Sequence, residues 1–121
     1  MFKMTIDKQK KVFRAEVSGF MTMELAEKFV KDYEEIVSKI NPKEYTLIVG
    51  AKELKASTRE TLPILAECFK FYMKDGFKQI YMTKADSPTC QMQLKRVGKE
   101  TNFTGTFVEE DAIPKTQYIA A

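Results

Sequence analysis

The fold class of this chain is decided by residues 45–83, which read YTLIVGAKELKASTRETLPILAECFKFYMKDGFKQIYMT. Residues 45–49 are uncharged strand formers, and residues 77–83 form a second strand-like run. Between them come a polar loop at residues 50–61 and a segment at residues 62–74 whose apolar residues recur at helical spacing. Strand, helix and strand in this order predict a βαβ unit, and therefore a sheet with parallel neighbours.

The residues that precede this unit predict a hairpin and a helix. Apolar and polar residues alternate over residues 2–7 and again over residues 12–17, which is the period of half-buried strands. We expect these two strands to pair at an edge of the sheet. Thr22 is placed to cap a helix whose apolar stripe runs on to Ile40, and the pair Asn41-Pro42 ends that helix.

The residues that follow the unit add a helix and a strand. The segment Asp86-Ser87-Pro88 is typical of a helix start, with the serine as N-cap and the proline at the first helical position. We expect residues 104–108 to form a last short strand. The order β-β-α-β-α-β-α-β predicts a single α/β domain over residues 1–113, with a mixed sheet and its helices mainly on one face. We expect residues 114–121 to form a disordered tail.

Composition places the chain among ordinary globular proteins. Of its 121 residues, 44% are hydrophobic and 31% charged, and the net charge is +3. Lysine and glutamate are mixed along the chain, so we expect no nucleic-acid partner. No apolar run reaches the roughly 18 residues of a membrane span, and no leader opens the chain. The two cysteines, Cys68 and Cys90, are not spaced as a CxxC pair, so we interpret them as reduced thiols in a cytoplasmic protein.

The absence of histidine narrows the chemistry further. A Ser-His-Asp or Cys-His mechanism is impossible within this chain, and zinc and haem sites lose their commonest ligand. Scattered carboxylates such as Glu60, Asp75 and Asp86 form no paired arrangement in the sequence. We therefore expect no enzyme activity, no metal site and no cofactor.

The element order resembles that of the STAS domain, the fold of anti-sigma factor antagonists, and of its looser SpoIIAA-like relatives. Several local segments are similar to that family over roughly residues 2–113. They are the turn Gly19-Phe20-Met21-Thr22, the central strand Tyr45-Thr46-Leu47-Ile48-Val49, the helix with Ser87-Pro88, Leu94 and Val97-Gly98, and the closing segment Phe107-Val108-Glu109-Glu110-Asp111-Ala112. The resemblance implies a STAS-like fold and a non-enzymatic role in regulation or binding.

The chain departs from the family in the loop after the central strand. Family members that act as phosphorylation switches carry an Asp at the end of that strand and an Asp-Ser-x-Gly motif before the next helix. Here Gly50 stands at the first position, and residues 56–62 read ASTRETL without an Asp-Ser pair. Ser57 and Thr58 are the hydroxyl residues nearest to the family's phosphoacceptor position, but the motif around them is missing. The resemblance therefore supports the fold and a binding role rather than the switch.

Two loops are expected to carry the binding surface, because residues 50–61 and 84–87 both follow the carboxyl ends of strands. In open α/β sheets ligands bind at those ends, and helix N-termini there supply N–H groups. We predict a rim for a protein partner or a small anionic ligand, composed of Lys52, Lys55, Ser57, Thr58, Arg59, Lys84, Ser87 and Thr89. The plainer interpretation is that these hydroxyls cap helices and that these lysines are solvated, which such residues do more often.

Two alternatives remain open at this point. Methionine and phenylalanine are abundant and could line an adaptable pocket, so the chain could carry a small apolar ligand between helices and sheet. Phe71 falls outside the apolar stripe of its helix. An exposed Phe71 would mark a protein contact, such as the face of a homodimer.

Overall fold

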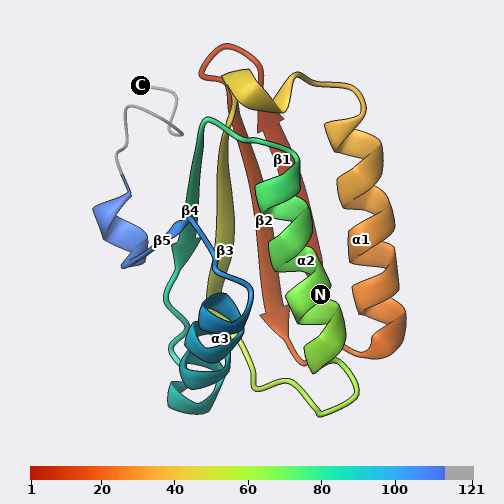
Figure 1. Cartoon of the computed structure of the whole chain (residues 1–121), viewed down its shortest axis with the longest axis vertical. Helices are drawn as coiled ribbons and strands as arrows, with labels where there is room; N and C mark the ends of the chain where they lie inside the picture. Colours follow the sequence, from red (N-terminus) through yellow and green to blue (C-terminus); the bar gives the residue numbers. More distant parts are fainter. Residues whose placement is uncertain (114–121) are drawn as a thin grey trace.

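The computed structural model describes residues 1–113 and arranges five strands in one sheet of order β1-β2-β3-β4-β5 (Figure 1). β1 and β2 are antiparallel, and every later neighbouring pair is parallel. The strands are β1 Phe2–Asp7, β2 Val12–Gly19, β3 Thr46–Leu54, β4 Gln79–Thr83 and β5 Thr106–Val108. The helices are α1 Met23–Val37, α2 Leu62–Lys74 and α3 Pro88–Glu100, with 3-10 helices η1 Pro42–Glu44 and η2 Glu110–Ala112. The predicted mixed α/β sheet is confirmed, whereas the predicted tail at residues 114–121 lies outside the described residues.

β1 and β2 form the edge hairpin that the alternating pattern predicts. They pair without interruption over all six residues of β1. Asp7 orders the turn, because its Oδ1 atom accepts hydrogen bonds from the N–H groups of Gln9 and Lys10 at 3.0 and 2.9 Å. Lys11 then adopts a φ of 58°, a left-handed conformation that is common in turns.

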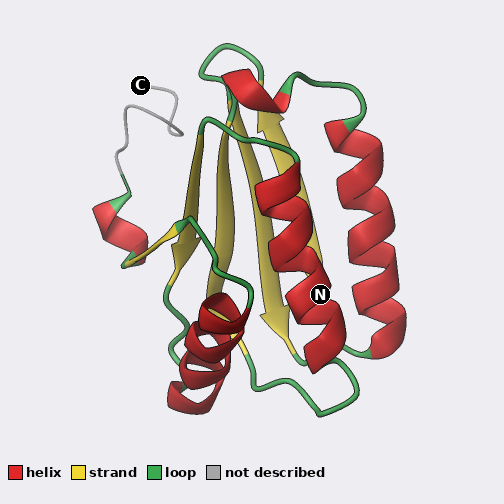
Figure 2. Cartoon of the chain, in the orientation of Figure 1, coloured by secondary structure: helices red, strands yellow, loops and turns green. Residues whose placement is uncertain are grey.

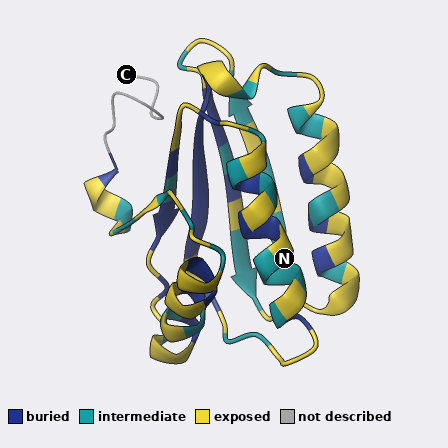
Figure 3. Ribbon diagram, in the orientation of Figure 1, coloured by how far each residue is buried: buried dark blue, intermediate teal, exposed yellow. Residues whose placement is uncertain are grey.

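The three helices cover one face of the sheet (Figure 2), as the element order predicts. Figure 3 shows the resulting core, with buried residues on the sheet and on the helix faces turned toward it. At its centre the ring of Tyr33 stacks on Phe13 with 5.8 Å between ring centroids and meets Tyr72 edge-on at 5.4 Å. The Tyr33 hydroxyl donates a hydrogen bond of 2.6 Å to Asp75 Oδ2, which gives this buried polar group the partner it needs.

Helix starts follow the predicted capping signals, but one helix end does not. Thr22 Oγ1 accepts from the N–H of Leu25 at 3.2 Å, and Ser87 Oγ accepts from the N–H of Cys90 at 3.2 Å. α1 ends at Val37, before the expected end at residue 40. Its last residues turn through tighter i to i+3 bonds, and Ile40 still packs against the core, which explains why the apolar stripe continues past the helix.

β3 is longer than its apolar run suggests, so the predicted loop at residues 50–61 is too long. The strand continues from Gly50 to Leu54 beside the end of β2, where the register shifts between Glu16 and Ser18. The Thr83 hydroxyl of β4 also accepts a 2.7 Å hydrogen bond from the N–H of Ala51. Pairing with the neighbouring strands therefore keeps these polar and small residues extended, and the loop itself spans residues 55–61.

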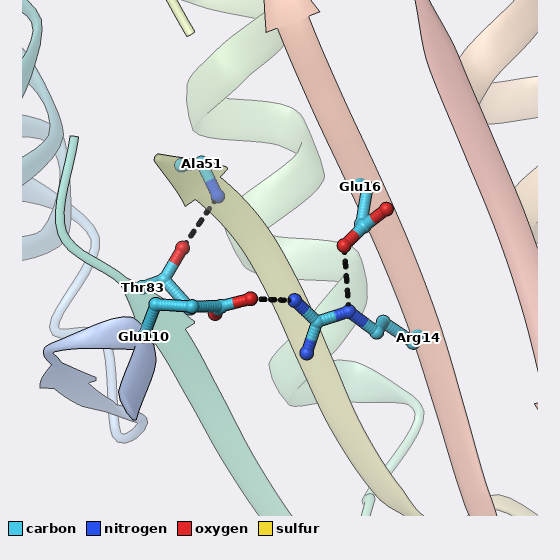
Figure 4. Close-up of polar contacts among 5 residues, drawn as sticks. All are labelled: Arg14, Glu16, Ala51, Thr83 and Glu110. Carbon is cyan, nitrogen blue, oxygen red and sulfur yellow. Dashed lines mark hydrogen bonds and ion pairs between the residues drawn. The ribbon is translucent and has the colours of Figure 1, made fainter. Parts of the chain in front are cut away.

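The face of the sheet without helices is covered in part by the segment that follows β5. Ile113 is only 2% exposed and packs with Val12 and Ile48. Next to them, Arg14 of β2 lies across β3 and pairs with Glu110 of η2, as Figure 4 shows. The Arg14 Nε atom also donates to Glu16 Oε1 at 2.8 Å, so one guanidinium ties the last described turn to the hairpin.

Gly50 makes room for this ion-pair network. A Cβ atom at this position would lie 3.0 Å from Glu16 Cγ and 3.5 Å from Arg14 Nη2. Burial alone would lower the pKa of Arg14, but its hydrogen bond to Glu16 and the charge of Glu110 outweigh that effect and raise it. The glycine that stands where the family's acid is expected therefore lies beneath a salt bridge on the face opposite the helices.

Candidate functional site

The carboxyl ends of β2, β3 and β4 lie at one end of the molecule, together with the N-termini of α2 and α3 (Figure 1). Loop 55–61 crosses this end. Its first residue is anchored to β2, because the N–H of Lys55 donates to the carbonyl oxygen of Gly19 at 3.0 Å. The topology thus places the predicted rim at the edge of the sheet where parallel strands end, which is where α/β proteins carry their ligands.

Gln93 of α3 holds the middle of the loop. Its Oε1 accepts from the N–H of Ser57 at 2.7 Å, and its Nε2 donates to the carbonyl oxygen of Ser57 at 3.0 Å. The side-chain amide therefore bonds to both backbone groups of one loop residue, as a neighbouring strand would. Sequence reasoning missed Gln93, because a lone glutamine within a helix carries no signal for a partner 36 residues away.

The second half of the loop forms the turn that starts α2. The carbonyl oxygen of Thr58 accepts from the N–H groups of Thr61 and Leu62, both at 3.2 Å, and the hydroxyls of Thr58 and Thr61 lie 3.2 Å apart. The helix begins after Thr61, with Pro63 in its first turn where no N–H is required. Ser57 is half-buried and Thr58 is exposed. Both hydroxyl residues therefore lie in the loop at this end of the molecule, but the acidic motif of a phosphorylation switch is absent around them.

Two of the predicted rim lysines are already paired. Lys52 Nζ lies 2.9 Å from Asp86 Oδ2, and this hydrogen bond raises the pKa of Lys52. Lys84 Nζ lies 3.4 Å from Glu109 Oε1, on the β5 side of β4. These contacts leave less positive charge for a free anion than the sequence alone suggests.

The structure does not gather all the predicted rim residues at one place. A hollow of about 400 Å³ brings together Lys52, Lys55 and Ser87, with Glu53 and Asp86 among its other lining residues. Ser57 and Thr58 lie in the loop, Lys84 lies beside β5, and Thr89 is exposed in the first turn of α3. Arg59 lies elsewhere, in a groove between two helices.

That groove, the α2–α3 groove, has a volume of about 400 Å³. Its apolar part consists of Leu62, Pro63, Ala66 and Val97, and its polar part of Arg59, Gln93, Arg96 and Glu100. Arg96 pairs with Glu100 at 3.1 Å, whereas Arg59 has no carboxylate partner within residues 1–113. The groove therefore combines an apolar floor with a cation that is unpaired in the described part of the chain, directly beside the loop that Gln93 holds.

A small apolar cavity lies beneath the loop, between the helices and the sheet. Its volume is about 60 Å³, and its lining includes Met21, Leu65, Cys68 and Phe69. An apolar cavity that admits benzene is roughly 150 Å³, and sites for drug-sized ligands are roughly 300 Å³ or more. The core in this conformation therefore lacks the room that a carrier of such ligands requires.

Both cysteines are free thiols and both are buried. Burial raises the pKa of the Cys68 thiol to about 12 and that of the Cys90 thiol to about 11. Cys90 lies in the first turn of α3, where the helix dipole favours a thiolate, but burial has the larger effect. Neither thiol is ionised at neutral pH. Phe71 is half-buried against the core, so it does not form the exposed contact considered above.

Comparison with known proteins supports the fold more than any particular activity. No protein-family model matches the chain, and no curated protein matches its sequence. Among solved structures, the chain is similar to an anti-sigma factor antagonist from Mycobacterium paratuberculosis. The match has a TM-score of 0.64 and 17% sequence identity, and covers 92% of this chain and 89% of that chain. This similarity confirms the STAS-like fold that the element order predicts.

Two general features of the described chain bear on function classes. Within residues 1–113, no helix has the length and apolar character that crossing a bilayer requires. The same residues include no group of three or more His, Cys, Asp or Glu side chains arranged to hold a metal ion.

Proposed function

We propose that this chain is a non-enzymatic, cytoplasmic regulatory module that binds a protein partner through loop 55–61 and the α2–α3 groove. The observation that carries this proposal is the groove itself, in which apolar floor residues lie beside Arg59, a cation with no carboxylate partner among the described residues. The structural similarity to a protein named as an antagonist of an anti-sigma factor supports a role that depends on contact with another protein.

The rim chemistry favours a protein partner over a small free anion. An anion bound at Lys52 would compete with Asp86, and one bound at Lys84 would compete with Glu109. A protein can instead place an apolar side chain on the groove floor and a carboxylate against Arg59, thereby gaining both apolar burial and a charge-assisted hydrogen bond. We therefore expect the partner segment to be apolar with flanking acidic residues.

The loop is suited to this role because its conformation is set before binding. The two bonds from Gln93 fix Ser57, and the Thr58–Thr61 turn fixes the start of α2. A surface that is already ordered loses less conformational entropy when a partner binds.

The test compares a variant that fills the groove with the unmodified protein. Ala66 is half-buried in the groove, so Ala66→Arg would occupy the space that a partner side chain needs. Proteins retained from an extract of the source cells would be quantified by mass spectrometry, and each specific one purified for a titration. We expect Ala66→Arg and Arg59→Glu each to weaken binding by about tenfold or more, as at a hot spot.

A charge-reversal set then separates a contact at this surface from a general effect of charge. The test variant changes three rim cations to glutamate: Lys52, Lys55 and Arg59. Its matched control makes the same change at three exposed lysines elsewhere: Lys43, Lys74 and Lys78. Loss of binding in the first variant alone supports the proposal. Equal binding by both triple variants and by Ala66→Arg would refute it.

A further inference from the structure

β1 forms an edge of the sheet and offers a second interaction surface, separate from the proposed partner site. β2 is its neighbour on one side, and no strand within residues 1–113 pairs with the other. The pairing with β2 is regular over all six residues of β1, without a bulge or a proline. Such an edge is a template for another strand unless its side chains prevent pairing.

The hydrogen bonds at the start of the hairpin establish which backbone groups face outward. Met1 and Ser18 exchange both bonds, with N···O distances of 3.0 and 2.8 Å. In an antiparallel ladder such pairs alternate, so Lys3, Thr5 and Asp7 also bond to β2. The N–H and C=O groups of residues 2, 4 and 6 therefore point to the open edge.

The space beside that edge suits the alternate side chains of an added strand. A hollow of about 440 Å³ lies between β1 and α1, with Phe2, Met4 and Ile36 as its apolar lining. Asp32, Glu35 and Lys39 of α1 complete its lining. An incoming strand would place its apolar side chains here and its polar side chains on the opposite face of the sheet.

We propose that a second copy of this chain occupies the edge, with the two β1 strands antiparallel about a two-fold axis at Thr5. In this register Met4 lies opposite the partner's Ile6, and these residues carry outward-facing backbone groups, so both pairs can exchange hydrogen bonds. Lys3 lies opposite the partner's Asp7 on the polar face. The Asp7 Oδ1 atom is engaged in its own turn, which leaves Oδ2 to accept from the partner's Lys3.

Self-complementary charge is the reason for choosing a second copy over a different protein. One end of β1 carries a lysine and the other an aspartate on the same face, so a two-fold axis forms two opposite-charge pairs at once. Lys3 would discourage pairing with an unrelated strand, but in this arrangement it lies opposite the aspartate of the second copy. The α2–α3 groove lies away from β1, so the dimer leaves that surface accessible (Figure 1).

The first test is the mass in solution, measured by analytical ultracentrifugation over a concentration series. We expect a concentration-dependent species of twice the 14.0 kDa of one chain. Lys3→Glu opposes two carboxylates at each pair and should weaken the dimer by about tenfold or more. Lys3→Glu combined with Asp7→Asn removes the repulsion, keeps the turn acceptor, and should recover part of that loss. Lys95→Glu makes the same charge change on the exposed side of α3 and should have no effect.

Amide exchange on the unmodified protein provides a second test that requires no variant. The N–H groups of Met4 and Ile6 should exchange rapidly in dilute protein and slowly in concentrated protein, while those of Lys3 and Thr5 stay protected at both. A chain that remains monomeric near roughly 1 mM would overturn the proposal, since specific pairing weaker than this has no practical consequence. A dimer that is insensitive to Lys3→Glu, or whose Met4 and Ile6 amides stay fast, would overturn it as well.

Discussion

Replacing Gln93 by alanine should release loop 55–61 and measurably destabilise the fold. The substitution removes two hydrogen bonds, of 2.7 and 3.0 Å, between the side-chain amide and the backbone of Ser57. A typical intramolecular hydrogen bond contributes about 1 kcal/mol. Two effects offset part of this loss. Alanine has a higher helix propensity than glutamine, which stabilises α3 by a few tenths of a kcal/mol. Water also replaces part of the lost hydrogen bonding, because the site is half-buried. We therefore expect the free energy of unfolding to fall by about 1.5 kcal/mol.

This loss can be measured by thermal unfolding. For a chain of 121 residues the unfolding entropy is about 0.25 kcal/mol/K, so the Tm should fall by about 6 °C. Lys95→Ala is the matched control, because Lys95 is exposed on the same helix and its loss should change stability by less than about 0.5 kcal/mol. Hydrogen exchange should show faster exchange at the Ser57 amide in Gln93→Ala and no change in the control.

One result would refute this role of Gln93. If Gln93→Ala unfolds at the temperature of the unmodified protein while the Ser57 amide keeps its protection from exchange, the Gln93 side chain does not hold the loop. If stability falls but partner binding is unchanged, the bonds support the fold without preordering the binding surface.

Three further expectations concern the core and the opposite face. Tyr33→Phe removes the 2.6 Å bond to Asp75 and should cost about 1.5–3 kcal/mol in a urea titration; no change in midpoint would contradict that bond. Gly50→Val brings side-chain atoms within contact of Glu16 and should cost about 1–3 kcal/mol by thermal unfolding, whereas an unchanged Tm would show that the network yields freely. Burial raises the pKa of the Cys68 thiol from 9.0 to about 12, so the folded state binds the thiol proton more tightly than the unfolded state does. The free energy of unfolding should therefore decline as the pH rises above about 9, by up to about 1.4 kcal/mol per pH unit. Burial also raises the pKa values of Tyr33 and Tyr72, so stability should keep declining above about pH 10 in the variant as well. Cys68→Ala should remove the part of the decline that begins near pH 9, and identical slopes for the two proteins between about pH 9 and 10 would exclude the thiol as its cause.

Local signals in the sequence were sufficient for most element starts and for the fold class. Thr22 and Ser87 both cap helices where their positions predicted, and α2 spans the expected residues 62–74. These features depend on residues close together in the chain, such as a hydroxyl before an apolar stripe or a proline in a first turn. The alternating pattern over residues 2–17 likewise predicted the edge hairpin.

Features that depend on distant residues could not be predicted in the same way. Lys52 and Glu53 interrupt the apolar run of the central strand, yet the strand continues because the end of β2 pairs with it. The bond between Gln93 and Ser57 exists only after α3 has packed beside the loop. The rim lysines looked available in the sequence because their acidic partners, such as Asp86 for Lys52, are brought close by the fold.

The ion pair between Arg14 and Glu110 also has a consequence for how the chain acquires its structure during synthesis. The two residues are 96 positions apart, so the guanidinium emerges from the ribosome long before its carboxylate does. The hairpin and the helices can pack against the sheet while Arg14 is still hydrated, because they cover the other face. Closure of the second face by Glu110 and Ile113 must wait until these residues have been synthesised, so we expect it to follow the packing of the first face.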